Sequence, residues 1–187
     1  MLSPTEKMKS VTWNIEILGR FEMTLDDGAT TEIPRRKMAS LLAWLILHPG
    51  RFYTRDFLAE LLWPEDPPDS SQDRFRHTLV EIRRLLEPTP ELRGVALTID
   101  RNGVKLNQGA ITSDAEEFQQ ALDGALSSDN SVSRLASLIE AIRVYKGDLL
   151  PGFYEDWIVH ERIRLSDEFI TSLCQAALLL AQAGDTI

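Results

Sequence analysis

The side chains of this sequence that could perform chemistry are basic residues spaced along one predicted helix. Apolar residues between Ser70 and Leu86 recur at helical spacing and, at about 100° per residue, form one inward stripe. That stripe comprises Phe75, Leu79, Ile82 and Leu86, flanked by Thr78 and Leu85. Basic side chains surround the opposite face: Arg74, Arg76, His77, Arg83 and Arg84. Arginine can bind guanine through two hydrogen bonds or contact a phosphate, which fits nucleic acid; a merely solvated charged face is the alternative.

Residue types needed for catalysis or metal binding are scarce in this sequence. Cys174 is the only cysteine, and the three histidines, His48, His77 and His160, lie far apart without metal-ligand spacing. The phosphate-binding pattern G-x-x-x-x-G-K-[ST] is absent. We therefore expect no enzyme activity, no metal site and no cofactor. Cys174 is predicted to be a buried small hydrophobe within an apolar helix, and His160 a surface residue.

Charge is distributed unevenly along the chain, whose formal net charge is −9. Residues 1–110 contain 15 of the 20 basic and 16 of the 29 acidic residues, whereas residues 111–187 contain 5 and 13. This asymmetry predicts two modules, 11–110 and 111–187, joined near Gln108–Ser113. The acidic second module is a poor partner for a polyanion, so we expect any nucleic-acid contact to come from the first.

The sequence contains no recognisable targeting or membrane-spanning segment. The first ten residues lack an apolar stretch, and the longest wholly apolar run, Leu41–Leu47, is far shorter than the roughly 18 residues that cross a bilayer. A single cysteine fits a reducing compartment. We expect a cytoplasmic protein without a membrane partner.

The N-terminal module begins with strand patterns and continues with helices. Residues 11–33 alternate in the manner of a small antiparallel sheet, with the turn signal DDG at 26–28. Residues 35–47 predict a helix whose inward stripe is Met38, Leu41, Leu42, Leu45 and Ile46. Thr54 is the expected N-cap of a second helix, which buries Phe57, Leu58, Leu61 and Leu62 and ends at Trp63-Pro64.

A hairpin follows the third helix. Two short strand-like runs, VALTID and GVKLN, flank a turn at Asn102-Gly103, with Arg101 at the tip and Lys105 on the returning strand. The order sheet, three helices, hairpin is typical of a winged helix-turn-helix, in which the third helix enters the major groove and the wing contacts backbone or minor groove. Arg36 and Arg55, each at a helix N-terminus, are further candidates for phosphate contact.

The acidic module is predicted to be helical. Residues 114–126 follow a capping box formed by Ser113 and Glu116, and residues 132–145 form a second helix. Its inward residues are expected to be Leu135, Leu138, Ile139 and Ile142. A long third helix begins near Glu155 and carries Trp157, Leu165, Phe169, Leu173, Ala176 and Leu180 on one face. Small alanine faces are similar to tetratricopeptide-type stacking, although no 34-residue period is present. We expect Ile187 to end only part of a longer protein.

Several of these segments resemble one family when taken together. The motifs HPGR, LAELLWP and GDLLPGFYEDW, with the run RHTLVEIRRLLEP and the hairpin TIDRNGVKLN, are similar to SARP/AfsR-type regulators. The resemblance covers about residues 14–187. It implies an α+β N-terminal winged helix-turn-helix of the OmpR/PhoB type, followed by an all-α, TPR-like helical domain, the bacterial transcriptional activation domain. Asp73, Phe75 and Glu81 depart from the family pattern and leave the base preference open.

The resemblance implies a transcriptional activator that binds direct repeats in double-stranded promoter DNA beside a second protomer and recruits RNA polymerase holoenzyme. The implied DNA-contacting residues are Arg74, Arg76, His77, Arg84, Arg101, Asn102, Lys105, Arg36 and Arg55. The acidic loop after the second helix, with Glu65, Asp66 and Asp69, would face the polymerase. The alternative function is a protein-interaction adaptor that uses the helical domain without specific DNA binding.

Overall fold

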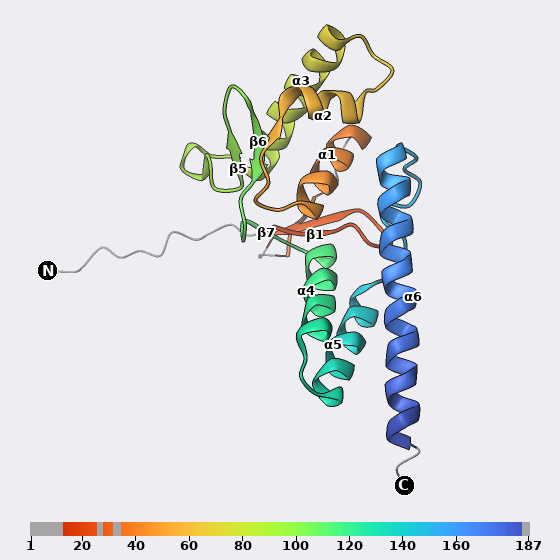
Figure 1. The fold of residues 1–187 in the computed structure, drawn as a ribbon. Helices are drawn as coiled ribbons and strands as arrows, with labels where there is room; N and C mark the ends of the chain where they lie inside the picture. The colour runs from red at the N-terminus through yellow and green to blue at the C-terminus, as the bar shows by residue number, and fades with distance from the viewer. Residues whose placement is uncertain (1–12, 26–27, 32–34, 185–187) are drawn as a thin grey trace, which may run out of the picture.

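The computed structural model describes residues 13–25, 28–31 and 35–184 of the chain. A four-stranded sheet lies at its middle, with the order β3-β2-β1-β7. It is formed by β1 (Trp13–Glu16), β2 (Glu22–Leu25), β3 (Thr30–Thr31) and β7 (Ile111–Ser113). Three helices and a hairpin lie on one side of this sheet, α4 and α5 lie on the other, and α6 runs along both parts (Figure 1). The predicted antiparallel sheet is confirmed, while its DDG turn falls partly outside the described residues.

Three helices of the N-terminal part form where the hydrophobic spacing predicts them. They are α1 (Arg36–Leu47), α2 (Arg55–Leu62) and α3 (Pro68–Leu86), and the predicted stripes of α1 and α3 are buried. The Thr54 side chain accepts a hydrogen bond from the Phe57 amide and caps α2 as expected. One core prediction is wrong: Phe57 is 40% exposed, because the inner side of α2 is filled by Leu58 and Leu62.

The wing is a three-stranded sheet rather than a simple hairpin. Strand β4 (Tyr53–Thr54) pairs with β6 (Gly103–Leu106), which pairs in turn with β5 (Leu97–Ile99). A short 3-10 helix, η1 (Pro90–Leu92), connects α3 to β5. The backbones of β4 and β6 approach each other so closely that only glycine fits at position 103. An added Cβ there would lie 2.0 Å from the Tyr53 carbonyl oxygen. The glycine in the predicted turn therefore allows β4 to join the wing.

The predicted junction near residues 108–113 forms part of the central sheet. Strand β7 pairs in parallel with β1 and leads directly into α4 (Asp114–Ser127). The Asp114 carboxylate, which is almost fully buried, accepts hydrogen bonds from the Ile17 and Leu18 amides at 2.8–3.1 Å. It also accepts one from the Ala115 amide at 2.8 Å. One carboxylate thereby fixes the start of the helical part to the end of β1.

The helical part consists of α4, α5 (Ser131–Val144) and α6 (Asp156–Gly184). The Ser113 hydroxyl accepts from the Glu116 amide, as the capping box predicts. None of the helices within the described ranges is long and apolar enough to span a bilayer. Four residues expected on the packed faces of these helices are exposed: Ile139, Leu173, Leu180 and Cys174. The reason is that α4 and α5 cover only one side of α6, and α6 covers only one side of α5.

One hydrophobic core crosses the predicted module boundary. It extends from Trp13 on β1 through α1 and α3 to Phe118 on α4 and Trp157 on α6. The rings of Trp44 and Trp157 meet edge to face at 5.2 Å, so these tryptophans pack α1 against α6. The two parts share this core, while a second, small cluster around Ala125, Leu138 and Ala176 lies within the helical part alone. A functional boundary after residue 110 stays a prediction.

We predict that Asp114 gives the fold a pH-dependent stability. Burial raises the pKa of this carboxyl from 3.8 to about 6, because lost hydration outweighs the backbone N–H groups that would lower it. A raised pKa in the folded state means that the associated stability is complete below about pH 3.8 and is lost as the pH rises to about 6. The shift corresponds to about 3 kcal/mol.

Comparison with Asp114→Asn isolates this contribution, because asparagine does not titrate. The free energies of unfolding of both proteins are measured by denaturant titration between pH 4 and pH 7. Wild type should exceed the variant most at the acid end, and the excess should shrink as the pH rises. An excess that stays constant over this range contradicts the prediction.

Candidate nucleic-acid interface

Helix α3 presents one continuous exposed face opposite its buried stripe. Asp73, Arg76, His77, Val80 and Arg84 are all exposed. Since these residues recur every three or four positions, they line one side of the helix over about three turns. The predicted orientation of α3 is confirmed: the apolar stripe packs on the core and the polar face is free for a partner.

The charge along this face changes from acidic to basic. Near the start of α3, Asp69 and Asp73 are exposed, and Asp73 pairs with Arg76 at 3.0 Å. Farther along, His77 and Arg84 have no hydrogen-bond or ion-pair partner in the described part of the chain. A cation in the last turn also interacts favourably with the helix dipole, so an arginine at position 84 stabilises α3 itself. The end of the face nearest the C-terminus of α3 is the most available to an anion.

Arg74 is directed toward the loop that precedes α3. Its guanidinium lies 2.9 Å from the Asp66 carboxylate. Glu65 is exposed in that loop, whereas Asp69, predicted as a loop residue, belongs to the first turn of α3. Contact between Arg74 and a base would require the pair with Asp66 to open.

A side-chain and backbone network holds the tip of the wing. The Asp100 carboxylate accepts hydrogen bonds from the amides of Asn102 and Gly103 at 2.7 and 2.9 Å. The Arg55 guanidinium donates to the Asp100 carbonyl oxygen, at 2.6 Å from Nη2 and 3.2 Å from Nε. Arg101 beside them is exposed and has no partner among the described residues. Arg55 therefore anchors the tip to α2, and Arg101 is left for a ligand.

Helix α3 and the wing tip border a common hollow of about 490 Å³. Arg76 lines it from α3, Arg55 from the start of α2, and Arg101 and Asn102 from the wing. Three of these four side chains are cationic, and the hollow is also lined by one carboxylate, Asp56, which accepts a hydrogen bond from Gln72 at 3.0 Å. Within the described ranges, this hollow brings predicted residues from the helix and the wing together, and its size and cations fit the backbone of an anionic polymer.

Two other residues predicted to contact DNA, Arg36 and Lys105, lie away from this hollow. Arg36 donates to the Gly152 carbonyl oxygen, and its guanidinium carbon lies 4.5 Å from the centre of the Phe153 ring. It therefore connects α1 to the segment before α6 and is not part of the α3 and wing surface. Lys105 is half-buried and lines a separate hollow with Arg51 on another side of the wing.

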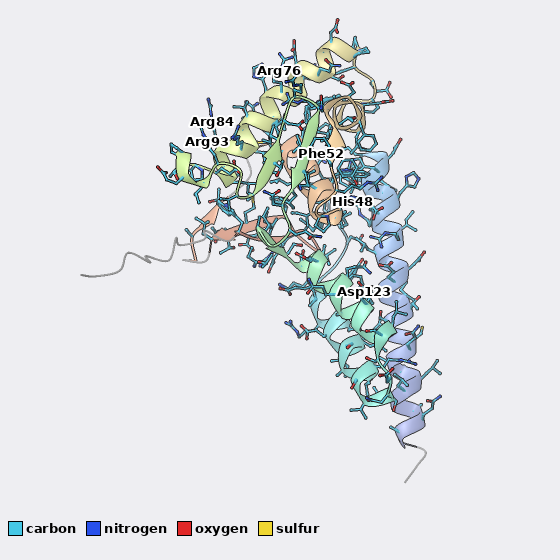
Figure 2. All side chains as sticks on the ribbon, turned by 60° about the vertical axis from the view of Figure 1, so that its left-hand side comes forward. His48, Phe52, Arg76, Arg84, Arg93 and Asp123 are labelled. Atoms are coloured by element: carbon cyan, nitrogen blue, oxygen red, sulfur yellow. The ribbon has the colours of Figure 1, made fainter. Side chains whose placement is uncertain are left out.

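Arg93 is a basic residue of this surface that sequence reasoning missed. It follows η1 and is exposed, and in Figure 2 it projects on the same side of the molecule as Arg84. No helical or strand periodicity marks a residue in such a connection, so only the packing of η1 reveals its position. Arg83, in contrast, pairs with buried Glu87 at 3.3 Å.

No family model matches the chain, but a curated relative does. The chain is 26% identical over 168 residues to the regulatory protein AfsR of Streptomyces coelicolor. The match covers 88% of this chain and 16% of AfsR. The resemblance to the SARP/AfsR type is thereby confirmed for a region that is a minor part of that relative.

A solved structure shares the fold. Mycobacterium tuberculosis EmbR, determined in complex with a low-affinity phosphopeptide, matches with a TM-score of 0.77 and 20% identity. The match covers 92% of this chain and 46% of that one, so this chain spans less than half of either relative. The predicted winged helix-turn-helix followed by a helical domain is confirmed.

We predict that Arg55→Ala loosens the tip of the wing without unfolding the chain. The variant loses two hydrogen bonds to the Asp100 carbonyl oxygen, each worth about 1 kcal/mol. Amide hydrogen exchange at Asn102 and Gly103 should accelerate about thirtyfold, since the two bonds together are worth about 2 kcal/mol and about 1.4 kcal/mol corresponds to a factor of ten. Arg101→Ala is the matched control and should leave these amides unchanged. Equal exchange rates in Arg55→Ala and wild type would contradict an anchoring role.

Proposed function

We propose that this chain is the DNA-binding part of a transcriptional regulator and that α3 enters the major groove of promoter DNA. One observation carries the proposal: Arg76 of α3 and Arg101 of the wing line the same hollow on a winged helix-turn-helix. The relationship to AfsR, a regulatory protein, supports it. Docking of this kind places the wing against the neighbouring backbone or minor groove.

The side chains divide into two roles in this proposal. Arg74 and His77 face base edges, with Arg74 released from Asp66 when DNA binds. Arg76, Arg84 and the wing residues Arg101 and Asn102 contact phosphates and fix the register of the protein on the duplex. Arg93 extends the phosphate-contacting surface beyond the end of α3.

The helical part has a different role in the same proposal. Its balance of 5 basic against 13 acidic residues over 111–187 disfavours contact with a polyanion. We propose instead that it presents a surface to RNA polymerase or to a second protomer on an adjacent direct repeat, and that the regulator is a cytoplasmic activator. Glu65 and Asp66, in the loop before α3, belong to the polymerase-facing side.

We predict that Arg84→Ala weakens binding to all duplex sequences about equally. A phosphate contact releases condensed counterions, so its loss should lower the slope of log K against log salt by about one. The measurement is a titration of labelled promoter duplexes at several salt concentrations, with folding checked by circular dichroism.

The control for this titration is Arg143→Ala, which removes an exposed arginine from α5. Its affinity and salt slope should equal those of wild type, because the helical part makes no DNA contact in the proposal. Equal loss in both variants would point to diffuse electrostatic attraction. Salt-independent or undetectable binding by wild type would instead favour the adaptor alternative.

We predict that Arg74→Ala acts on specificity. It should cost about 1–3 kcal/mol on the best site and relax the preference at one base pair, as loss of a bidentate base contact does. Selection from a randomised duplex library compares the variant with wild type. Phe75→Ala serves as the unfolded reference, since deleting this buried ring costs roughly 3–5 kcal/mol. An unchanged preference in folded Arg74→Ala would remove this residue from the base-contacting set.

A further inference from the structure

A large hollow lies between the winged helix and the start of α6, away from the α3 and wing surface. Its volume is about 730 Å³, and it is lined by residues of α1, α2, the loop before α3 and the first turns of α6. In Figure 1 the upper end of α6 lies beside α1 and α2, on the side of the molecule opposite to β5 and β6. We call it the α2–α6 groove.

Exposed aromatic side chains form part of the α2–α6 groove. Phe57 is 40% exposed and Tyr154 is 76% exposed, with the largely buried Trp157 between α6 and the core. The Phe57 ring stacks on that of Tyr53 at 5.4 Å and lies 5.6 Å from that of Trp44. Because these contacts hold the ring in place, Phe57 offers a fixed aromatic surface to a ligand.

The groove also carries uncompensated negative charge. Glu60, Glu65 and Asp156 line it, and none of them has an ion-pair partner in the described part of the chain. The basic residues of the groove are Lys37, which Glu155 engages at 3.1 Å, and the exposed His160, so acidic side chains outnumber basic ones. An aromatic surface surrounded by carboxylates fits an arginine or lysine side chain, which can lie over a ring and bind a carboxylate at the same time.

We propose that the α2–α6 groove binds a basic peptide segment of a partner protein. Charge complementarity selects this occupant: a nucleic acid would meet three carboxylates, and a purely apolar segment would strip them of water without replacing their hydrogen bonds. The groove lies outside the surface proposed for DNA but includes Glu65 of the loop proposed to face the polymerase, so this inference rests on that part of the proposed function, while its peptide-binding test is separate from the DNA titration. Its occupant and a duplex can be bound together.

The probe is a fluorescein-labelled peptide, (Arg-Gly-Leu)₃, with (Glu-Gly-Leu)₃ as its acidic counterpart. Fluorescence polarisation should detect binding of the basic peptide alone. The double variant Glu60→Gln/Glu65→Gln should weaken it about tenfold. The matched control, Glu117→Gln/Asp129→Asn, removes two exposed carboxylates from the helical part and should change the affinity less than twofold.

A second variant tests the aromatic surface without relying on charge. Phe57→Leu keeps apolar bulk but removes the ring face, so a folded Phe57→Leu protein should bind the peptide several-fold more weakly. On peptide binding, hydrogen exchange should slow in residues 57–65 and 154–160.

Three results would overturn the proposal. Equal weakening by the groove and control pairs would mean that the peptide is attracted only by net charge. Unchanged affinity in both Glu60→Gln/Glu65→Gln and Phe57→Leu would place the peptide elsewhere. Sedimentation showing a dimer of wild type that the groove pair dissociates would identify a second copy of this chain as the occupant.

Discussion

Two buried carboxylates hold the elements of this fold in register, and the surfaces of the molecule depend on them. Asp114 binds the amides at the end of β1, and Glu87, at the end of α3, binds the amides of Ala96 and Leu97 at 2.9–3.0 Å. Each carboxylate accepts hydrogen bonds from backbone N–H groups that would otherwise be buried without partners. A buried donor left without a partner would cost about 1–3 kcal/mol. Glu87 thereby sets the wing against α3, and Asp114 sets the helical part against the central sheet.

The same structure decides which cations remain available to a ligand. Basic residues are dense in the first 110 positions, but pairing consumes many of them: Arg35 with Glu81 at 2.9 Å, Lys37 with Glu155, and Arg36 with a backbone carbonyl. Cations at the N-terminus of α1 are disfavoured by the helix dipole. The internal contacts of these three residues compensate for that cost, so no external phosphate is needed to account for them. Among the described residues, His77, Arg84, Arg93 and Arg101 near α3 and the wing tip have no such partner, whereas Arg74 and Arg76 are paired with Asp66 and Asp73. Internal pairing therefore decides which cations a ligand can reach directly and which must first be released.

Local signals in the sequence were sufficient for the helices and for the face of α3 that is exposed. Hydrophobic spacing located α1, α2 and α3, and hydroxyl caps located the starts of α2 and α4, because both effects act within a few residues. The parallel pairing of β7 with β1 and the use of Arg36 inside the chain connect positions about 100 residues apart, and no local pattern contains them. The exposure of Leu173 and Leu180 was not predicted for a related reason. An apolar stripe shows which side of a helix can be buried, but whether it is buried depends on which other helices pack against it.

A continuous core has a mechanical consequence for the two surfaces. Strand β7 runs into α4 without a linker, and contacts from α1 to the segment before α6 add a second connection between the parts. The α3 surface and the α2–α6 groove therefore lie on one continuously packed body. In such a body, a ligand at one surface need not alter the shape of the other in order to influence it. If both proposals hold, a partner bound in the groove would be kept at a fixed position relative to a duplex on α3, and its effective concentration near that duplex would rise. Recruitment by geometry alone would be sufficient for the activity proposed, and the buried carboxylates that fix the geometry would then be as necessary to it as the residues proposed to contact DNA.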